Sequence, residues 1–242
     1  MKVVILAGGK GTRLRPYTTA FPKPLMPIGN RPVLEIIVRQ LKAQGFKEII
    51  MAVGYLSELI RAFFGDGSKF GVNITYSKEE QPLGTVGGLS LIRQELNDTF
   101  LMINGDTLMS LNFSDLIDDH ERNRAIATIA LKKRHVPIDF GVVEVNGNGK
   151  VNGYTEKPTL VNLVSTGVNA LSPRILEYIE PSRYLDFPTL IQKLIAAGQT
   201  VRGYIFDGYW LDIGRPDDYE KANAEIETIN GVLGITEDDI IE

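Results

Sequence analysis

The chain has 242 residues, of which 43% are hydrophobic and 23% charged, an ordinary globular composition that excludes a disordered or fibrous protein. Its 26 Lys and Arg against 30 Asp and Glu give a net charge of −4 with no basic block, which argues against nucleic-acid binding. The absence of cysteine excludes thiolate catalysis, cysteine-ligated zinc and iron–sulfur clusters, and it agrees with a cytoplasmic location.

Short apolar runs alternate with amphipathic segments through the first half of the chain, which predicts βα units. Strands are expected at residues 2–7, 48–53, 72–77 and 100–104, and helices at 32–44, 57–64 and 86–96. Because strands separated by helices usually pair in parallel, we expect a mostly parallel, Rossmann-like α/β sheet flanked by helices. The apolar run at the N-terminus is too short for a signal peptide or a membrane span, so no membrane partner is expected.

Extended runs dominate the middle of the chain, after a polar helix at 114–123. Strands are expected at 126–132, 141–145, 151–156 and 166–171, with a tight hairpin at Asn146–Gly149. Helices are expected again at 173–179, 188–197 and 216–229, with strands at 201–206 and 209–213. We therefore expect one α/β domain whose second lobe is mixed or antiparallel.

A glycine-rich segment follows the first strand. Gly8, Gly9 and Gly11 fall within four residues, together with the cations Lys10 and Arg13. Such glycines let backbone N–H groups approach phosphate oxygens, so a phosphate loop is favoured over a simple surface turn. The dinucleotide-binding fingerprint lacks its third glycine here, and the Walker A motif lacks its Lys-Ser/Thr pair.

Lys23 lies between Pro22 and Pro24 in a second loop. Proline fixes the backbone, so this ammonium is held with little conformational entropy left to lose on binding. Taken alone, a solvated loop lysine explains the pattern equally well. His120 and His135 stand beside charged residues in no motif, and both are expected to be exposed.

An ordered set of motifs over more than two hundred residues resembles the sugar-1-phosphate nucleotidyltransferases, also called nucleotide-sugar pyrophosphorylases. The matching segments are Gly8–Leu14, Lys23–Pro24, Leu83–Thr85, Gly105–Asp106, Glu156–Pro158 and Trp210–Gly214. Asp106 and Asp212 each follow an apolar run, which places both carboxylates at strand ends, where open α/β sheets bind ligands.

The resemblance implies a GT-A-like nucleotidyltransferase fold in a single domain, 1–242. It implies a nucleotide-binding part over about 1–110, a sugar-binding lobe over about 111–213 and a C-terminal helix over about 215–230. The implied reaction transfers a nucleoside monophosphate from an NTP to a sugar 1-phosphate and releases pyrophosphate, with Mg²⁺ as cofactor. A homo-oligomer is compatible with this family.

The resemblance also implies roles for individual residues. Arg13 and Lys23 are expected to act as catalytic residues on the triphosphate and the departing pyrophosphate, and Asp106 and Asp212 to hold Mg²⁺. Thr85 is expected both to contact the nucleotide and to cap the helix that it begins. The nucleotide is expected against Leu6, Ala7, Gly8, Gly9, Gly11, Thr12, Arg13, Gln81, Leu83, Gly84, Thr85 and Asp106. The sugar phosphate is expected against Gly141, Glu156, Lys157, Gly167 and Asn169.

The sequence is compatible with several functions. The segment Glu80–Thr85 resembles the guanylyltransferases for mannose or heptose 1-phosphates, with uridylyl- or thymidylyltransfer to glucose-type sugars as the alternative. An aromatic residue is common in the family where Asn169 stands, so the sugar is left open. The rival functions are a glycosyltransferase, a non-catalytic sugar-phosphate-binding relative and a Rossmann oxidoreductase. The chain ends soon after its last helix, so no appended β-helix and no second activity are expected.

Overall fold

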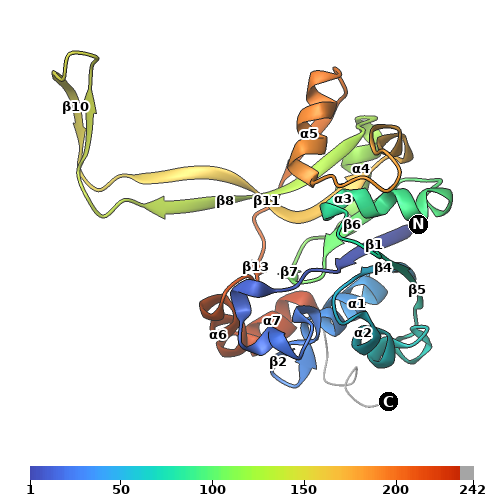
Figure 1. Cartoon of the computed structure of the whole chain (residues 1–242). Coiled ribbons are helices and arrows are strands. Elements are labelled where there is room, and N and C mark those ends of the chain that lie inside the picture. Colours follow the sequence, from blue (N-terminus) through green and yellow to red (C-terminus); the bar gives the residue numbers. More distant parts are fainter. Residues whose placement is uncertain (235–242) are drawn as a thin grey trace.

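A seven-stranded sheet lies at the centre of the computed structural model, which describes residues 1–234 (Figure 1). Its strands, in chain order, are β1 (Lys2–Ala7), β4 (Glu48–Val53), β5 (Asn73–Lys78), β6 (Phe100–Asn104), β8 (Ala127–Pro137), β11 (Thr159–Leu171) and β12 (Val201–Ile205). The spatial order is β12-β8-β11-β6-β1-β4-β5. Within this sheet β11 runs antiparallel to β6 and β8, and all other neighbours are parallel, which confirms the predicted mostly parallel sheet.

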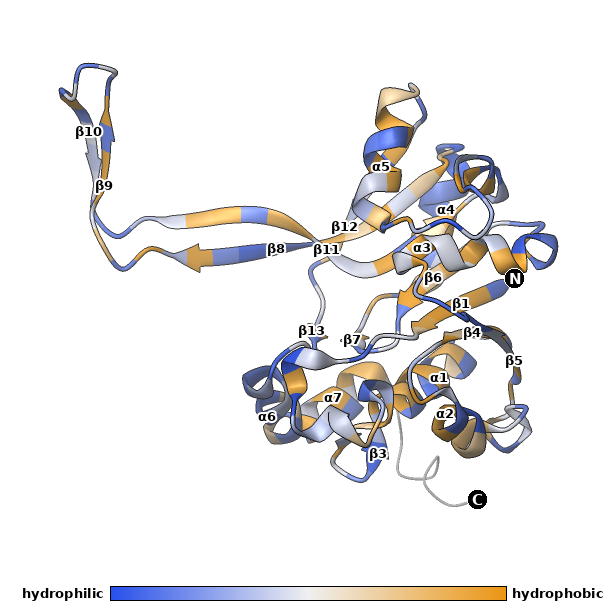
Figure 2. Ribbon diagram, viewed as in Figure 1, coloured by the Kyte–Doolittle hydropathy of each residue, from blue (hydrophilic) through white to orange (hydrophobic). Residues whose placement is uncertain are grey.

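Helices cover both faces of the sheet. They are α1 (Val33–Ala43), α2 (Ser57–Phe64), α3 (Gly84–Gly87), α4 (Phe113–Arg122), α5 (Phe187–Ala196), α6 (Pro216–Ala224) and α7 (Ile226–Leu233). Side chains alternate along β1, so Val3 and Ile5 enter one core cluster and Val4 enters the other. Figure 2 shows the resulting concentration of hydrophobic residues in β1 and β6. None of the helices in the described part is long and apolar enough to cross a membrane.

The remaining strands of the described residues form three small two-stranded sheets. They are β2 (Pro27–Ile28) with β3 (Arg31–Pro32), β7 (Thr107–Met109) with β13 (Trp210–Asp212), and β9 (Val142–Val145) with β10 (Val151–Thr155). The hairpin predicted at Asn146–Gly149 joins β9 to β10, where Gly149 has a φ of 75° and the Asn146 N–H donates to the Lys150 carbonyl at 3.0 Å.

Three predicted helices have a different form, and the one predicted at 173–179 is a 3₁₀ helix, Pro173–Tyr178. The sequence predicts one helix at 86–96, but a single turn, α3, is followed by a 3₁₀ helix that is interrupted at Ile92. Glycine explains the change: a Cβ at Gly87 would lie 2.4 Å from the Arg183 carbonyl oxygen, so this segment is shaped by close packing. Residues 216–229 form two helices, which meet at Glu225, whose carboxylate accepts a 2.9 Å hydrogen bond from Tyr209.

The expectation of an exposed His120 is wrong. Its side chain is 2% exposed, and Nδ1 lies 3.0 Å from the Thr128 hydroxyl on β8. His120 lies on the inner face of α4, whose buried residues include Phe113, Leu116 and Ile117. Of its charged neighbours, Asp118 and Glu121 are exposed, whereas Asp119 is part-buried and forms an ion pair with Arg202 of β12. His135 is exposed, as expected.

The strands predicted at 126–132 and 166–171 are longer than expected. β8 continues to Pro137 and β11 begins at Thr159, and these extra residues pair with each other. Together with β9 and β10 they form a long arm that projects away from the rest of the molecule (Figure 1). We call residues 132–165 the arm.

Candidate active site

The glycine-rich loop after β1 packs against the loop that contains Lys23. Gly11 has a φ of 58°, and a Cβ there would lie 3.0 Å from the Lys23 Cβ and 3.0 Å from the Thr18 Cγ2. The Thr18 hydroxyl donates to the Gly11 carbonyl at 2.7 Å. Glycine is thus required at position 11 by both conformation and space, and the two loops that carry Arg13 and Lys23 are held together.

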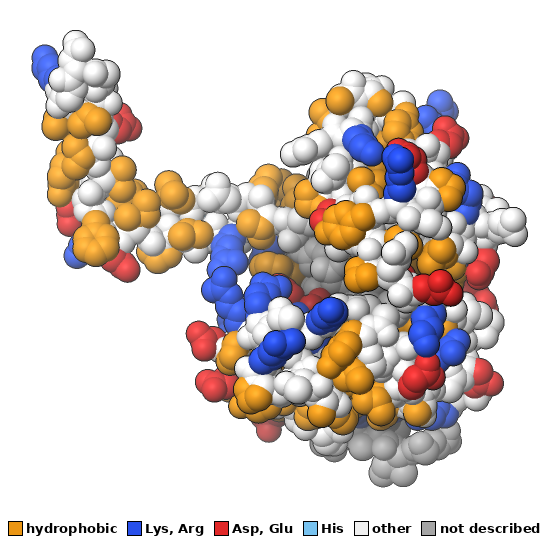
Figure 3. All heavy atoms as spheres, in the orientation of Figure 1, with side chains coloured by type: hydrophobic (Ala, Val, Ile, Leu, Met, Phe, Trp, Pro, Cys, Tyr) orange, Lys and Arg blue, Asp and Glu red, His pale blue; other side chains and the backbone are white. Residues whose placement is uncertain are grey.

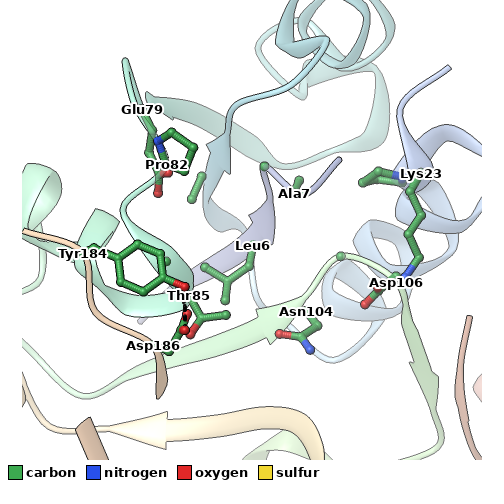
Figure 4. A pocket seen from close by; sticks show the side chains of 16 residues that line it. Leu6, Ala7, Lys23, Glu79, Pro82, Thr85, Asn104, Asp106, Tyr184 and Asp186 are labelled. Carbon is green, nitrogen blue, oxygen red and sulfur yellow. Dashed lines mark hydrogen bonds and ion pairs between the residues drawn. The ribbon is translucent and has the colours of Figure 1, made fainter. Parts of the chain in front are cut away.

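A pocket of about 390 Å³ opens at the carboxyl ends of β1 and β6 (Figure 4). This is the edge at which open α/β sheets bind ligands. Its lining brings together eight of the predicted residues: Leu6, Ala7, Gly8, Gly9, Lys23, Gly84, Thr85 and Asp106. Sequence reasoning missed further residues of the lining, among them Glu79, Asn104, Tyr184 and Asp186.

One end of the pocket is charged. The Lys23 ammonium forms an ion pair with the Asp106 carboxylate, and their side chains are only 10% and 22% exposed (Figure 4). β13 pairs with β7 so that Asp212 lies opposite Thr107, and the Ile213 N–H donates to the Asp106 carbonyl at 3.0 Å. These backbone contacts bring both predicted metal-binding aspartates to one place.

The two aspartates interact electrostatically. Burial is the main cause of a raised pKa at Asp212, and the negative charge of Asp106 adds to the rise. The positive charges of Lys23 and Arg13 oppose it. A divalent cation would favour the ionised form of both carboxylates in the same way.

The donor set fits Mg²⁺. Asp106 and Asp212 supply carboxylate oxygens, and the buried hydroxyl of Thr107, which follows Asp106 and pairs with Asp212 in the strand register, makes no hydrogen bond to the residues that the structure describes. No group of three or more His, Cys, Asp or Glu side chains in residues 1–234 is arranged to hold a metal. Two carboxylates, completed by phosphate oxygens and water, are an ordinary arrangement for Mg²⁺.

The other end of the pocket is built from the loop before α3 and the residues before α5. Gly84 has a φ of 80°, and a Cβ there would lie 2.6 Å from the Leu185 carbonyl oxygen. Asp186 accepts hydrogen bonds from the Thr85 N–H at 3.2 Å and from the Tyr184 hydroxyl at 2.6 Å. Segments about one hundred positions apart in the sequence therefore form one wall.

The expectation that Thr85 caps its own helix is wrong. No side chain caps α3, and the Thr85 hydroxyl instead accepts a hydrogen bond of 2.6 Å from the backbone N–H of Phe187, the first residue of α5. The hydroxyl thus takes the place of an N-cap side chain for a helix elsewhere in the chain, since Asp186, which precedes α5, does not cap it.

A second cleft of about 300 Å³ lies on the other side of Asp212. Its cations are Arg13, Arg134, Arg215 and Lys221, and its carboxylates are Asp212 and Asp218. Figure 3 shows Lys and Arg side chains gathered below the base of the arm, on this side of the molecule. Arg215 directly follows the Trp210–Gly214 motif, so its position in the sequence indicates that it belongs to the site. Arg134 comes from β8, and nothing in its sequence neighbourhood indicates the site.

Five residues predicted to contact the nucleotide do not line the first pocket. Gln81 and Thr12 are exposed, Leu83 is buried, and Gly11 supports the loop as described above. Arg13 lines the second cleft.

The residues predicted for the sugar phosphate fall into two groups. Gly141, Glu156 and Lys157 lie on the arm and line neither cleft. Gly167 and Asn169 lie on β11 at the base of the arm. A Cβ at Gly167 would lie 2.5 Å from the Asn104 side-chain amide of the first pocket. Asn169 is 2% exposed, and its Oδ1 accepts no hydrogen bond from the described residues.

Comparison with known proteins gives consistent matches over nearly the whole chain. A family model described as nucleotidyl transferase matches residues 2–229. A UTP–glucose-1-phosphate uridylyltransferase of Synechocystis sp. is 37% identical, and the match covers 96% of this chain and 63% of that protein. A mannose-1-phosphate guanyltransferase of Yarrowia lipolytica is 38% identical, with 90% of this chain and 62% of that protein covered.

Among solved structures, a putative glucose-1-phosphate thymidylyltransferase from Bacillus anthracis, in complex with sucrose, has a TM-score of 0.75 and 27% sequence identity. The match covers 93% of this chain and 94% of that one. By contrast, the chain spans less than two thirds of the length of the two curated relatives.

Proposed function

The chain belongs to the nucleotidyl transferase family, and from that premise we propose that it transfers a nucleoside monophosphate from an NTP to a sugar 1-phosphate. An oxygen of the sugar phosphate attacks the α-phosphorus, the bond from that phosphorus to the bridging oxygen breaks, and pyrophosphate leaves. The observation that carries the proposal is the convergence of Lys23, Asp106, Asp212 and Arg13 beside a pocket of nucleoside size.

Charge is the main obstacle to this reaction. A phosphate monoester carries about −1.5 to −2 at neutral pH, so the sugar phosphate and the triphosphate repel each other. The attacking phosphate oxygen is already a nucleophile and needs no general base, so positioning and charge neutralisation supply the catalysis. Arg13 and Lys23, which lie on adjacent loops, neutralise the triphosphate and the departing pyrophosphate.

Mg²⁺ is the cofactor that we propose, held by Asp106 and Asp212 with the Thr107 hydroxyl beside them. When bound, it withdraws charge from the phosphate oxygens. Lys23 forms an ion pair with Asp106, so its ammonium lies where it can neutralise both this carboxylate and phosphates bound beside it.

Guanine is the base that the pocket fits best. The Glu79 carboxylate lines it, and burial raises the pKa of that carboxyl. One carboxylate oxygen accepts from the Leu83 N–H at 3.1 Å, and within the described residues the other accepts no hydrogen bond. Guanine offers a ring N–H and an amino group side by side, which suit such an acceptor, whereas uracil offers a single N–H. The guanyltransferase relative supports the same choice, and uridylyl- or thymidylyltransfer is the alternative.

The sugar phosphate is assigned to the part of the chain after about residue 110, with the nucleotide on the part before it. Mannose or heptose 1-phosphate is the leading substrate. Gly167 lies against Asn104 of the pocket, Asn169 is two residues further along β11, and Lys157 is the cation assigned to the monophosphate. We place the protein in the cytoplasm, because nucleoside triphosphates and sugar phosphates are found there and a chain without cysteine is compatible with it.

A pyrophosphate-release screen tests this function. The four common NTPs and dTTP are each combined with mannose, heptose and glucose 1-phosphates in the presence of Mg²⁺. We expect release with GTP and mannose or heptose 1-phosphate, and a loss of about a hundredfold or more in kcat for Asp106→Asn and Asp212→Asn. Consumption of a nucleotide sugar without pyrophosphate formation would indicate a glycosyltransferase, and sugar-phosphate binding without turnover would indicate a non-catalytic relative.

A further inference from the structure

The arm is held away from its own active site by a regular ladder. Residues 159–165 of β11 pair with residues 137–131 of β8 without interruption, and β8 leaves the sheet after Leu131, which still pairs with Ile205 of β12. At about 3.3 Å per residue, this ladder carries Pro137 roughly 20 Å beyond the sheet. β9 and β10 extend it further (Figure 1). With these pairs formed, the arm extends away from the body of its own chain.

The arm exposes much of the apolar surface of the molecule. Nine of the eighteen large apolar side chains that are strongly exposed in residues 1–234 belong to it, although the arm is a small part of the chain. These nine are Val136, Phe140, Val143, Val145, Val151, Tyr154, Leu160, Val161 and Leu163. Figure 3 shows apolar side chains gathered along the length of the arm. A two-stranded ribbon alone is marginally stable in water, and exposed apolar patches of this kind mark interaction surfaces.

Lys157, the cation assigned to the sugar phosphate, lies where the ladder meets the β9–β10 hairpin. It has a φ of 43°, a left-handed conformation that is uncommon for a residue with a side chain and that occurs preferentially at functional sites. Neither cleft of the same chain includes it. The two clefts of one chain therefore lack the cation that we assign to the sugar phosphate.

The outer part of the arm and the second cleft have net charges of opposite sign, whereas the whole arm contains five Lys and Arg against three Asp and Glu. The outer part of the arm, residues 137–160, contains three carboxylates, Asp139, Glu144 and Glu156, against two lysines. The second cleft contains Arg13, Arg134 and Arg215, and within residues 1–234 none of these three side chains forms an ion pair or a hydrogen bond. The cleft also contains Lys221, Asp212 and Asp218, so its net charge is positive, and an outer arm with one carboxylate in excess complements it.

We propose that the arm of one copy of this chain lies across the cleft between Arg13 and Asp212 of a second copy and supplies Lys157 to the sugar phosphate bound there. This inference rests on the proposed function. Because the same surfaces exist on both copies, the exchange is reciprocal, and a dimer of two-fold symmetry contains two sites, each built from the body of one subunit and the arm of the other. The apolar side chains of the arm are then covered by the partner.

Complementation between two inactive variants tests the origin of Lys157. Asp106→Asn disables the body and leaves the arm intact, and Lys157→Ala disables the arm and leaves the body intact. Each variant is expected to lose about tenfold or more in activity at a sugar phosphate concentration below its KM. When the two chains are co-expressed with different tags and the mixed dimer is purified by both tags, one of its two sites contains an intact body and an intact arm. We expect about half of the wild-type activity per dimer.

If the arm acted on its own chain, every site of the mixed dimer would contain one defect, and activity would stay at the average of the two variants. That result, obtained with an active wild type, would contradict the exchange of arms between subunits without contradicting the proposed function.

The molecular mass in solution tests the interface without any assay of activity. The wild type is expected to sediment as a dimer. Phe140→Asp, which places a charge on a side chain that is 78% exposed on the outer part of the arm, should sediment as a monomer with an unchanged circular dichroism spectrum. Ile195→Asp, at a side chain that is 60% exposed on α5, is the matched control and should stay dimeric. A monomeric wild type, or a dimer that Phe140→Asp leaves intact, would overturn the proposal even if no substrate pair reacts.

Discussion

The Lys23 ammonium forms an ion pair with the Asp106 carboxylate, although the two residues are 83 positions apart and neither side chain is more than 22% exposed. The pair joins the loop beside the glycine-rich segment to the end of β6, so it fixes the charged end of the pocket before any ligand binds. In such a partly buried pair, removal of one partner leaves the other charge without compensation.

A double-mutant cycle measures that coupling. Lys23→Met and Asp106→Asn should each lower the free energy of unfolding, and the double variant should be more stable than the sum of the two losses predicts, by about 0.5–3 kcal/mol. Urea unfolding of the four proteins without Mg²⁺ provides the values. If the double variant loses as much free energy of unfolding as the two single variants together, the ion pair contributes nothing to the stability of the free enzyme.

His120 predicts a pH dependence of stability. Burial lowers its pKa, and the charge of Asp119 opposes this only in part. Because the folded state then binds a proton less readily than the unfolded state, whose histidine has a pKa near 6.5, the free energy of unfolding should fall as the pH drops from about 6.5 through the lower pKa of the folded state. One such group contributes a slope of at most about 1.4 kcal/mol per pH unit.

His120→Gln should flatten that part of the profile, and His135→Gln, which changes an exposed histidine on the arm, should not. Urea unfolding between pH 7.5 and 5 at constant ionic strength gives both profiles. Equal slopes in the wild type and His120→Gln would assign the acid sensitivity to other groups.

The hydroxyl of Thr85 predicts a stability effect at a distance in the sequence. Thr85→Val keeps the shape of the side chain but removes the acceptor for the Phe187 N–H, so it should lower the free energy of unfolding by about 0.5–2 kcal/mol, as the loss of a helix cap does. Thr85→Ser keeps the hydroxyl and should restore most of the loss. Denaturant titration of the three proteins measures their free energies of unfolding. A Thr85→Val protein as stable as the wild type would show that Thr85 has no capping role.

The parallel part of the fold could be predicted because its signals are local. β1, β4 and β6 are buried apolar runs bounded by glycine or polar residues, and they form where the sequence places them. The same holds for Asp106, since a polar residue directly after a buried strand lies at the ligand-binding edge. The family model and the relatives agree with the family that the ordered motifs indicate.

The arm and much of the pocket wall could not be predicted, because they depend on pairing between distant segments. The charged run Lys132–His135 has no strand pattern of its own and becomes extended by pairing with residues 161–164. Asp186 reaches the pocket wall through a hydrogen bond from Thr85, about one hundred positions earlier, and Tyr184 is joined to that wall through its hydrogen bond to Asp186. The burial of His120 could not be predicted for a similar reason, since its partner Thr128 lies on another element.

Glu79 predicts the base preference. Glu79→Gln removes the carboxylate that we assign to the donors of guanine, so kcat/KM for GTP should fall about 10- to 100-fold, as expected when a buried polar contact is lost. Activity with UTP should change much less. Glu80→Gln, at the exposed neighbouring position, is the matched control. Equal losses for GTP and UTP would show that Glu79 supports the loop through Leu83 without reading the base.

Arg13 provides the sharpest test of the catalytic assignment. It lines the cleft on the Asp212 side and forms no ion pair within the described residues, so its guanidinium is free to bind phosphate oxygens. If it neutralises charge that develops on pyrophosphate as this group leaves, its loss should lower kcat more than it raises KM for the NTP. Arg13→Lys should remain well below the wild type, because an ammonium cannot bind two phosphate oxygens in the bidentate geometry of a guanidinium.

The measurement is kcat and KM for the NTP in Arg13→Lys, Arg13→Ala and Lys23→Ala, with the sugar phosphate saturating. Lys10 is exposed in the same loop and lines neither cleft, so Lys10→Ala is the matched control, and its kcat should stay near that of the wild type. A rise in KM with unchanged kcat would show that Arg13 binds the ground state and the transition state equally. Full activity in Arg13→Lys would reduce the requirement to a single positive charge, since the bidentate contact would then contribute nothing to the rate.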